Sequence, residues 1–335
     1  IGDLYSIDTL LERLRLLAQR RPEGMLLAYG FDDTTIGEQR YPTRAELDSV
    51  SKTRPIMVMH ISGHLGVVNS AALESMSIKE DVEDPPGGFY GRDETGRLNG
   101  LLAETAFNPV RSQALKLAPM DGLKVLSRAS HIYLSRGITF AQNGLADPAA
   151  IRALKPALQF GLIPLRLSVW PNAEAEKLRQ ASKLRLPQGE RSHLGPVKLV
   201  SDGSLQGYTG FLSAPYYTLP DDYPPDYLGF PTRSQTALSA QVKQFHCQGR
   251  QVAVHANGDA AIDLSLNAIA GARAACPQVR VQPVLIHAQM ATPAQLQRMV
   301  ALDVIPSFFN THVYYWGDRH RDIFLGPERA RRISP

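Results

Sequence analysis

Two histidines close apolar stretches in the second half of the chain. His255 ends the stretch Val252–His255, and His287 ends Val284–His287, 32 residues further on. That interval fits one repeat of strand, helix and strand, so the two imidazoles would stand at matching depth on successive strands. Imidazole is a common ligand of zinc and related metals. The pair therefore predicts a metal site, although a single histidine at a strand end is more often structural.

A lysine interrupts a third apolar stretch. Lys198 lies in Val197–Ser201 and is followed by Asp202. Burying an ammonium group without a partner is costly, so the position calls for an explanation. One explanation is structural: Lys198 forms an ion pair with Asp202, or its side chain reaches solvent. The other is a lysine that has reacted with CO₂ to give a carbamate, which can bridge two metal ions as a carboxylate does. In the second case Asp202 would orient Lys198.

The elements that position these residues alternate between strand and helix. Uniformly apolar strands that alternate with helices predict a parallel sheet covered on both faces. Six such units favour a TIM-like (β/α) barrel, with a doubly wound sheet as the alternative. Residues at the carboxyl ends of barrel strands converge on one face. The predicted strands are Ile138–Gln142, Leu165–Trp170, Val197–Ser201, Val252–His255, Val284–His287 and Val304–Phe308.

The first third of the chain carries a different pattern. Helical spacing over 7–20, strands over 25–31 and 56–61, and turn residues at 84–88 and 91–97 predict a β-rich insertion with a hairpin. We therefore expect residues 1–79 and 126–335 to form the barrel and residues 80–125 to be inserted in it. Residues 207–233 hold five prolines and no periodic pattern, which fits a substrate lid or a linker equally well.

Several stretches together resemble the amidohydrolase superfamily, and within it amidohydrolase family 3, the metal-dependent hydrolases with a composite domain. Each stretch is a weak signal, but they follow one another in the family's order over most of the chain. They are Gly63–Leu73, Asp84–Gly88, Val197–Ser204, His255–Asp259, Ile286–Gln289 and Leu325–Ala330.

The resemblance implies a barrel with one or two divalent metal ions, usually zinc. His255 and His287 match the family's two single-histidine strands, and Lys198 matches its bridging lysine. By the same resemblance His64 and Asn69 belong near the substrate pocket. His312 and Trp316, after the last predicted strand, are further candidates for substrate contact, and His60 could line the pocket.

Two family features are missing from the sequence. No H-x-H pair occurs among the nine histidines, and no Ser-Asp-x-Pro strand follows Val304–Phe308. We therefore expect a barrel that is incomplete at both ends, a fragment whose missing strands flank it. A relative that has lost its metal centre is the alternative. An incomplete barrel leaves open sheet edges, so the chain by itself should show no measurable activity.

The predicted function is a metal-dependent hydrolase acting on a C–N bond of an amide, formamide or cyclic amide. The alternatives are a non-catalytic descendant that binds a small molecule or regulates a process, and an isomerase or C–O hydrolase on the same scaffold. The sequence shows no Gly-x-Ser-x-Gly elbow and no phosphate-binding glycine loop. These absences argue against serine hydrolases and P-loop or dinucleotide enzymes.

Composition limits the partners. Thirty-six basic and 32 acidic residues give a net charge of +4, a weak argument for nucleic acid. No apolar run is long enough to cross a membrane. The two cysteines, Cys247 and Cys276, form no CxxC motif and predict neither a disulfide framework nor a cysteine metal site. We expect a cytoplasmic protein with a small-molecule substrate, and a homodimer if it assembles.

Overall fold

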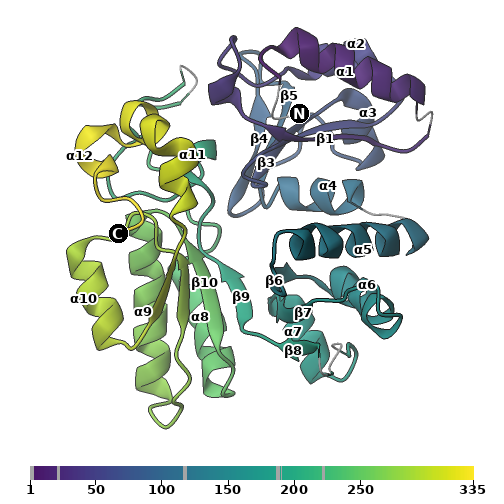
Figure 1. Cartoon of the computed structure of the whole chain (residues 1–335). Helices are drawn as coiled ribbons and strands as arrows, with labels where there is room; N and C mark the ends of the chain where they lie inside the picture. The colour runs from purple at the N-terminus through teal and green to yellow at the C-terminus, as the bar shows by residue number, and fades with distance from the viewer. Residues whose placement is uncertain (1–3, 21–22, 116–118, 186–188, 190, 221–222) are drawn as a thin grey trace. The chain divides into compact units, whose positions relative to one another are not determined.

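The computed structural model describes residues 4–20, 23–115, 119–185, 189, 191–220 and 223–335. The chain divides into two compact units. Unit 1 contains residues 1–116, 202–233 and 311–333, and unit 2 contains residues 117–201, 234–310 and 334–335. The elements of both are labelled in Figure 1. The predicted barrel and insertion boundaries, 1–79, 80–125 and 126–335, stay a prediction.

Unit 1 is built on a five-stranded mixed sheet with the strand order β1-β2-β3-β5-β4. β1 and β2 are parallel, and the other neighbours are antiparallel. β4 and β5 form the hairpin predicted between residues 80 and 125, with Arg92 opposite Leu98. β5 also pairs with β3 and so belongs to the sheet. The strands are β1 (Leu26–Phe31), β2 (Ile56–His60), β3 (Leu65–Val68), β4 (Gly88–Arg92) and β5 (Leu98–Glu104).

Helices cover this sheet because they carry apolar faces. In α1, Ile7, Leu10, Leu11 and Leu14 are buried at the spacing of one helix face and join the core formed by β1 and β2. α2 begins with a capping box between Thr43 and Glu46. The described helices are α1 (Ile7–Arg20), α2 (Arg44–Val50), α3 (Ser70–Ser75), α4 (Phe107–Ala114), α11 (Thr311–Arg319) and α12 (Gly326–Ala330), with a π-helical turn at His320–Phe324.

Unit 2 is the series of parallel strands and helices that the sequence predicts. β6 and β7 are parallel, and β9, β10, β11 and β12 form a parallel sheet in which neighbours in space are neighbours in sequence. A single bridge between Asn172 and Lys198 joins the end of β7 to β9. The strands are β6 (Phe140–Ala146), β7 (Arg166–Pro171), β8 (Ser192–Leu194), β9 (Val197–Val200), β10 (Val252–Ala256), β11 (Val284–His287) and β12 (Ile305–Phe308).

The helices between these strands complete the α/β pattern. Asp147 caps α6, Asn172 caps α7, Ser234 caps α8 and Thr292 caps α10, each accepting a backbone N–H in the first turn. Mixed α/β architecture is thus confirmed, whereas closure of a TIM-like barrel stays a prediction. The helices are α5 (Pro119–Ser135), α6 (Pro148–Gln159), α7 (Ala173–Gln180), α8 (Gln235–Cys247), α9 (Asp259–Ala275) and α10 (Pro293–Ala301).

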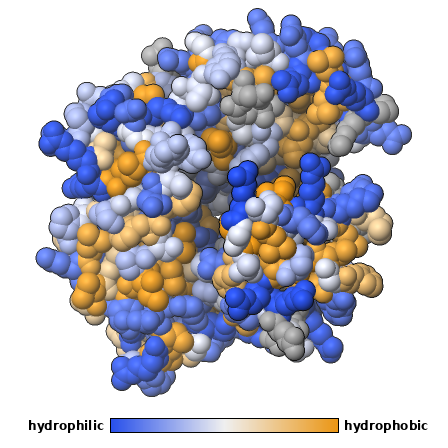
Figure 2. Space-filling model, in the orientation of Figure 1, coloured by the Kyte–Doolittle hydropathy of each residue, from blue (hydrophilic) through white to orange (hydrophobic). Residues whose placement is uncertain are grey.

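The surface mixes hydrophilic and hydrophobic residues across the visible face (Figure 2). Large exposed apolar side chains include Phe160 after α6 and Tyr314 on α11. Scattered apolar exposure of this kind is ordinary for a folded protein. Within the described part of the chain, we find no helix of the length and hydrophobicity needed to span a membrane.

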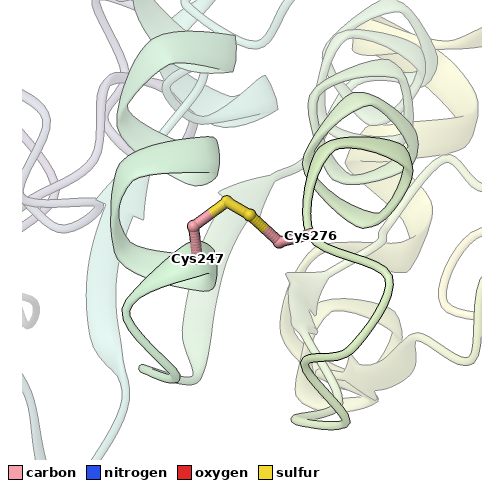
Figure 3. Close-up of a disulfide and its surroundings, with 2 residues drawn as sticks. All are labelled: Cys247 and Cys276. Atoms are coloured by element: carbon pink, nitrogen blue, oxygen red, sulfur yellow. A yellow bond between two sulfur atoms is a disulfide. The ribbon is translucent and has the colours of Figure 1, made fainter.

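One disulfide lies in unit 2, between Cys247 and Cys276 (Figure 3). The expectation from the sequence that Cys247 and Cys276 form no disulfide framework is therefore corrected: the two residues are bonded to each other. α8 and α9 flank β10 and run in the same direction, so their carboxyl ends lie at the same level. Cys247 is the last residue of α8 and Cys276 directly follows α9. The disulfide could have been predicted from the sequence, because the two cysteines lie at the ends of two successive predicted helices that connect parallel strands.

Replacing both cysteines by serine is expected to lower the free energy of unfolding by about 3 kcal/mol, because the bond closes a loop with a sequence separation of 29. Urea unfolding of the wild type and the double variant measures this. A reductant should bring the wild type to the level of the double variant and leave that variant unchanged. Equal stability of oxidised wild type and double variant would refute the stabilising role.

Candidate functional site

The three predicted metal-binding residues lie on successive parallel strands of unit 2. Lys198 is in β9, His255 in β10 and His287 at the end of β11. Lys198 is opposite Ala253, and His255 is opposite Val200, so Lys198 and His255 share one face of the sheet two positions apart. Lys198 is 8% exposed and His255 is 5% exposed. The buried Lys198 and His255 and the partly buried His287 thus lie on three neighbouring strands, with the two histidines at the carboxyl ends of β10 and β11.

The backbone at the end of β11 turns His287 toward His255. Ala256 is the partner of His287 in the parallel ladder, so strict alternation would place the two histidines on opposite faces. His287 instead has a φ of 71° and Ala288 a φ of 46°. Left-handed backbone at two consecutive non-glycine residues is strained and often marks functional sites. The two imidazole rings lie with centroids 4.6 Å apart.

Hydroxyl and amide groups fix His255 in place. The backbone N–H and the Oγ of Ser201 both donate to the carbonyl oxygen of His255, at 3.0 and 2.5 Å. The Oγ of Ser265 donates in turn to the Ser201 Oγ. The side-chain amide of Asn257 lies 3.2 Å from His255 Nε2. These contacts tie the end of β10 to β9 and set the orientation of the imidazole.

Burial lowers the pKa of Lys198 from 10.5 to about 8. No ion pair of Lys198 is present among the described residues of unit 2. At pH 7.5, such a group is neutral in about a quarter of the molecules, against about 0.1% for an ordinary lysine. The neutral amine is the nucleophile that carbamate formation needs. The environment of Lys198 therefore permits the reaction with CO₂.

A cavity of about 480 Å³ in unit 2 lies away from these residues. It is lined by Phe140, Val284 and Ile305, the first residues of β6, β11 and β12, together with Trp170 and Arg250. Its lining also includes Ser168 of β7 and Ser307 of β12, further along those strands, but none of Lys198, His255 and His287. In parallel α/β folds ligands bind at the carboxyl ends. We do not assign the substrate to this cavity.

In unit 1, His64 and Asn69 have different environments. His64 precedes β3, and its Nδ1 lies 3.0 Å from the carboxylate of Glu104 at the end of β5. Asn69 is fully buried and caps α3. Its side chain accepts from the N–H groups of Ile56 and Ala72 and donates to the carbonyls of Ser51 and Arg54. These four hydrogen bonds fix the start of α3, and substrate contact by Asn69 stays a prediction.

His312 and Trp316 lie one turn apart on α11, with ring centroids separated by 6.4 Å. Burial lowers the pKa of His312 to about 4, so this imidazole is neutral at physiological pH. The indole N–H of Trp316 donates to Asp32 at 3.3 Å. Both residues are thus anchored in unit 1, and substrate contact by them stays a prediction.

Asp202 is fully buried in unit 1, and one of its carboxylate oxygens accepts the backbone N–H of Phe211. Its predicted role in orienting Lys198 stays a prediction. Residues 208–220 and 223–233 form neither helix nor strand, as their composition predicts.

A second group of metal-capable side chains occurs in unit 1. Asp32, Asp33 and His60 offer ligand atoms within 4.8 Å of one another, and all three are buried. The two aspartates were not among the candidates identified from the sequence, although they directly follow the apolar strand β1. Asp32 is already neutralised by the guanidinium of Arg319 at 2.5 Å and by hydrogen bonds from Thr34. A cation there would compete with Arg319, so we do not place the catalytic metal in this group.

Comparison with known proteins decides the family. A family model described as amidohydrolase family matches residues 2–335. The chain belongs to the amidohydrolase family. This confirms the resemblance seen in the ordered motifs.

Relatives within the amidohydrolase family match nearly the whole chain at low identity. The chain is similar to the amidohydrolase YtcJ of Bacillus subtilis, with 28% identity over 99% of this chain and 62% of that protein. It is also similar to the N-substituted formamide deformylase of Arthrobacter pascens, with 25% identity over 90% of this chain and 56% of the relative. The chain thus spans about three fifths of the length of these relatives.

A solved structure supports the fold of this amidohydrolase-family chain. The metal-dependent hydrolase of Pyrococcus furiosus superimposes with a TM-score of 0.65, covering 98% of this chain and 64% of that one, at 24% identity. At this identity the likeness establishes the fold, and the site must be argued from the residues of this chain.

Proposed function

We propose that the chain forms part of a metal-dependent hydrolase that cleaves a C–N bond in a small amide, formamide or cyclic amide. The observation that carries the proposal is the pair of imidazoles, His255 and His287, held 4.6 Å apart on neighbouring parallel strands. Buried Lys198 on the next strand adds a third potential donor. Membership of the amidohydrolase family and the name of the Arthrobacter relative support the C–N bond as the target.

The donor set fits a divalent metal. His255 and His287 would hold it through ring nitrogen, and zinc is the first choice for such ligands. Lys198 would join as a carbamate: its neutral Nζ forms a bond to the carbon of CO₂ and releases one proton, which leaves a negatively charged ligand. A bound divalent cation lowers the pKa of a water molecule and polarises a carbonyl oxygen.

Residues of this chain would hold the metal-binding side chains in position before a metal ion binds. Ser201 and Ser265 fix the strand end that carries His255, and the left-handed turn at His287 directs the second ring toward the first. Burial of Lys198 lowers the pKa of its amine and so keeps a fraction of it neutral. Holding ligands in place in advance lowers the entropy cost of assembling the site.

Hydrolysis by the full-length protein tests this proposal. The panel should hold formamides, linear amides and cyclic amides, with matched esters and lactones for comparison. We expect turnover of at least one C–N substrate, loss of turnover with a chelator, and recovery on adding zinc. Turnover of esters alone would indicate C–O chemistry. Binding without turnover across the panel would favour a non-catalytic binding protein.

The disulfide bears on the cellular compartment in which the protein is found. Disulfides persist in oxidising compartments and are rare in the cytoplasm. The bond between Cys247 and Cys276 therefore counts against the cytoplasmic location expected from the sequence, and we propose an oxidising compartment instead. Alkylation of free thiols in freshly lysed source cells checks this: two modified cysteines per chain would restore the cytoplasmic assignment.

A further inference from the structure

The contact between α8 and α9 in unit 2 keeps one register along its length. Near the start of the helices the side-chain amide of Gln235 donates to the carbonyl oxygen of Leu264 at 3.1 Å, over a sequence separation of 29. At their ends the disulfide joins the two cysteines, again with a separation of 29 (Figure 3). Residues about 29 positions apart thus lie at the same level. His246 and Arg273, in the last turns of α8 and α9, therefore lie within one turn of each other.

His246 is buried at this level with one ring nitrogen that forms no hydrogen bond. The residue is 1% exposed, and its Nε2 has no hydrogen-bond partner among the described residues. The Nε of Arg273 is also buried and has no partner in the described part of the chain. A buried polar atom without a hydrogen bond costs stability. The ends of α8 and α9 are therefore a weak part of the contact.

The surroundings of His246 disfavour its protonated form. Burial lowers the pKa of the imidazole, and the positive charge of Arg273 lowers it further. Arg273 itself is paired with Asp303, which precedes β12, at 3.5 Å. The other ionisable side chains on α8, just after it, or on α9 and β10 are exposed, held in ion pairs or placed at the opposite ends of α9 and β10: Lys243, Arg250, Asp259, Asp263 and His255.

Acid therefore favours separation of the helix ends. In an opened state the imidazole of His246 is hydrated and titrates at the ordinary 6.5, whereas its pKa in the closed contact is lower. Below pH 6.5 the open state binds more protons than the closed state, so opening becomes easier as the pH falls. Well above pH 6.5 the ring is neutral in both states, and its titration no longer affects opening.

The disulfide lies where this opening would begin. Cys247 directly follows His246, and Cys276 lies three residues after Arg273, so the covalent bond joins the same two turns. A bond between the helix ends prevents their separation whatever the charge on the imidazole. The two helices are also the connections on both sides of β10, which carries His255. Keeping the helix ends together therefore keeps the surroundings of β10 intact.

We propose that His246 makes the contact between α8 and α9 sensitive to acid, and that the disulfide keeps the helix ends together when this imidazole is protonated. Acid loosens the contact only after the disulfide is reduced. Reductant and acid thus act together on this device, which needs neither a bound metal nor a substrate.

Hydrogen–deuterium exchange of the full-length protein at pH 7.5 and pH 5.0 tests both parts. Mass spectrometry follows peptides from the ends of α8 and α9, and protection is expressed relative to the intrinsic exchange rate at each pH. In Cys247→Ser/Cys276→Ser, protection of these ends should be several-fold lower at pH 5.0 than at pH 7.5. An open-state pKa of 6.5 sets the upper limit of this loss at about 30-fold. In the oxidised wild type, protection should be the same at both pH values.

Two further substitutions, each added to the double cysteine variant, assign the acid response. His246→Leu places an apolar side chain that cannot be protonated in the same space, so protection should no longer depend on pH. His131→Leu removes an exposed histidine of unit 2 and should leave the acid response as it is in the double variant. If the double variant does not fold, the wild type treated with a reductant replaces it.

The same loss of protection in acid with His246→Leu would overturn the role of His246. No acid response in the double variant would overturn the whole proposal, and an equal response in the oxidised wild type would overturn the role of the disulfide. If the protein with His246→Leu does not fold, NMR titration of the His246 ring in the oxidised wild type decides instead. Titration below pH 6.5 supports the proposal, and titration at or above pH 6.5 would contradict it.

Discussion

Replacing His255 by alanine is expected to abolish hydrolysis without unfolding the protein. Changing residues that only support metal ligands already costs 10- to 100-fold in activity, so loss of a ligand should cost more than about 100-fold. His255 lies at the carboxyl end of β10, and the centroid of its imidazole lies 4.6 Å from that of His287. The initial rate of amide hydrolysis by the full-length protein measures the effect, and thermal unfolding confirms the fold.

A matched control is available on α5. His131 belongs to the same unit, is exposed, and forms a hydrogen bond through its ring with the backbone carbonyl of Ser127. His131→Ala should keep wild-type activity. If His255→Ala also keeps it, the pair of imidazoles has no part in the reaction. His287→Ala should behave as His255→Ala does, since the two rings act on the same ion in our proposal.

Replacing Lys198 by methionine should stabilise the metal-free protein and destroy its activity. A folded-state pKa of about 8 against the ordinary 10.5 corresponds to about 3 kcal/mol that the charged amine costs the folded state near pH 7. Methionine has a similar length and carries no charge. Urea unfolding after chelation should therefore give a higher free energy of unfolding for Lys198→Met at pH 7, by about that amount.

The pH dependence follows from the direction of the shift. Well below pH 8 the lysine is charged in both the folded and the unfolded state, and the full free-energy cost of its burial is present. Between pH 8 and about 10.5 the unfolded chain binds more protons than the folded one, so wild-type stability rises with pH. The difference in free energy of unfolding between Lys198→Met and the wild type should therefore become smaller between pH 8 and about 10.5. A variant that is less stable than the wild type at pH 7 would show that Lys198 is a structural residue with an unrecognised partner.

Much of unit 2 could be predicted from the sequence. Short, largely apolar runs predicted β7, β9, β10 and β11 to within a residue or two, because buried parallel strands admit few polar residues. β12 was predicted as closely, although its residues are exposed or partly exposed. β6 was placed early: the prediction ended at Gln142, whereas the strand continues to Ala146. Its later part, Asn143-Gly144-Leu145, carries little of the β-branched signal on which strand prediction depends.

Long-range partnerships were beyond sequence reasoning. The ion pair between Asp32 and Arg319 joins residues 287 positions apart, and no local sequence pattern predicts it. The pairing of His64 with Glu104 depends on the antiparallel register of β3 and β5, which the sequence does not fix. The left-handed backbone at His287 is similarly hidden, since alternation alone would direct this ring away from His255.

Elemental analysis of the purified full-length protein tests the central claim most directly. We predict one or two divalent ions per chain in the wild type and in His131→Ala, and well below one in the double variant His255→Ala/His287→Ala. His60→Ala, which removes the imidazole of the second group, should keep its metal. If the double variant keeps its full metal content, or if His60→Ala alone loses the ion, the metal centre does not lie at the ends of β10 and β11.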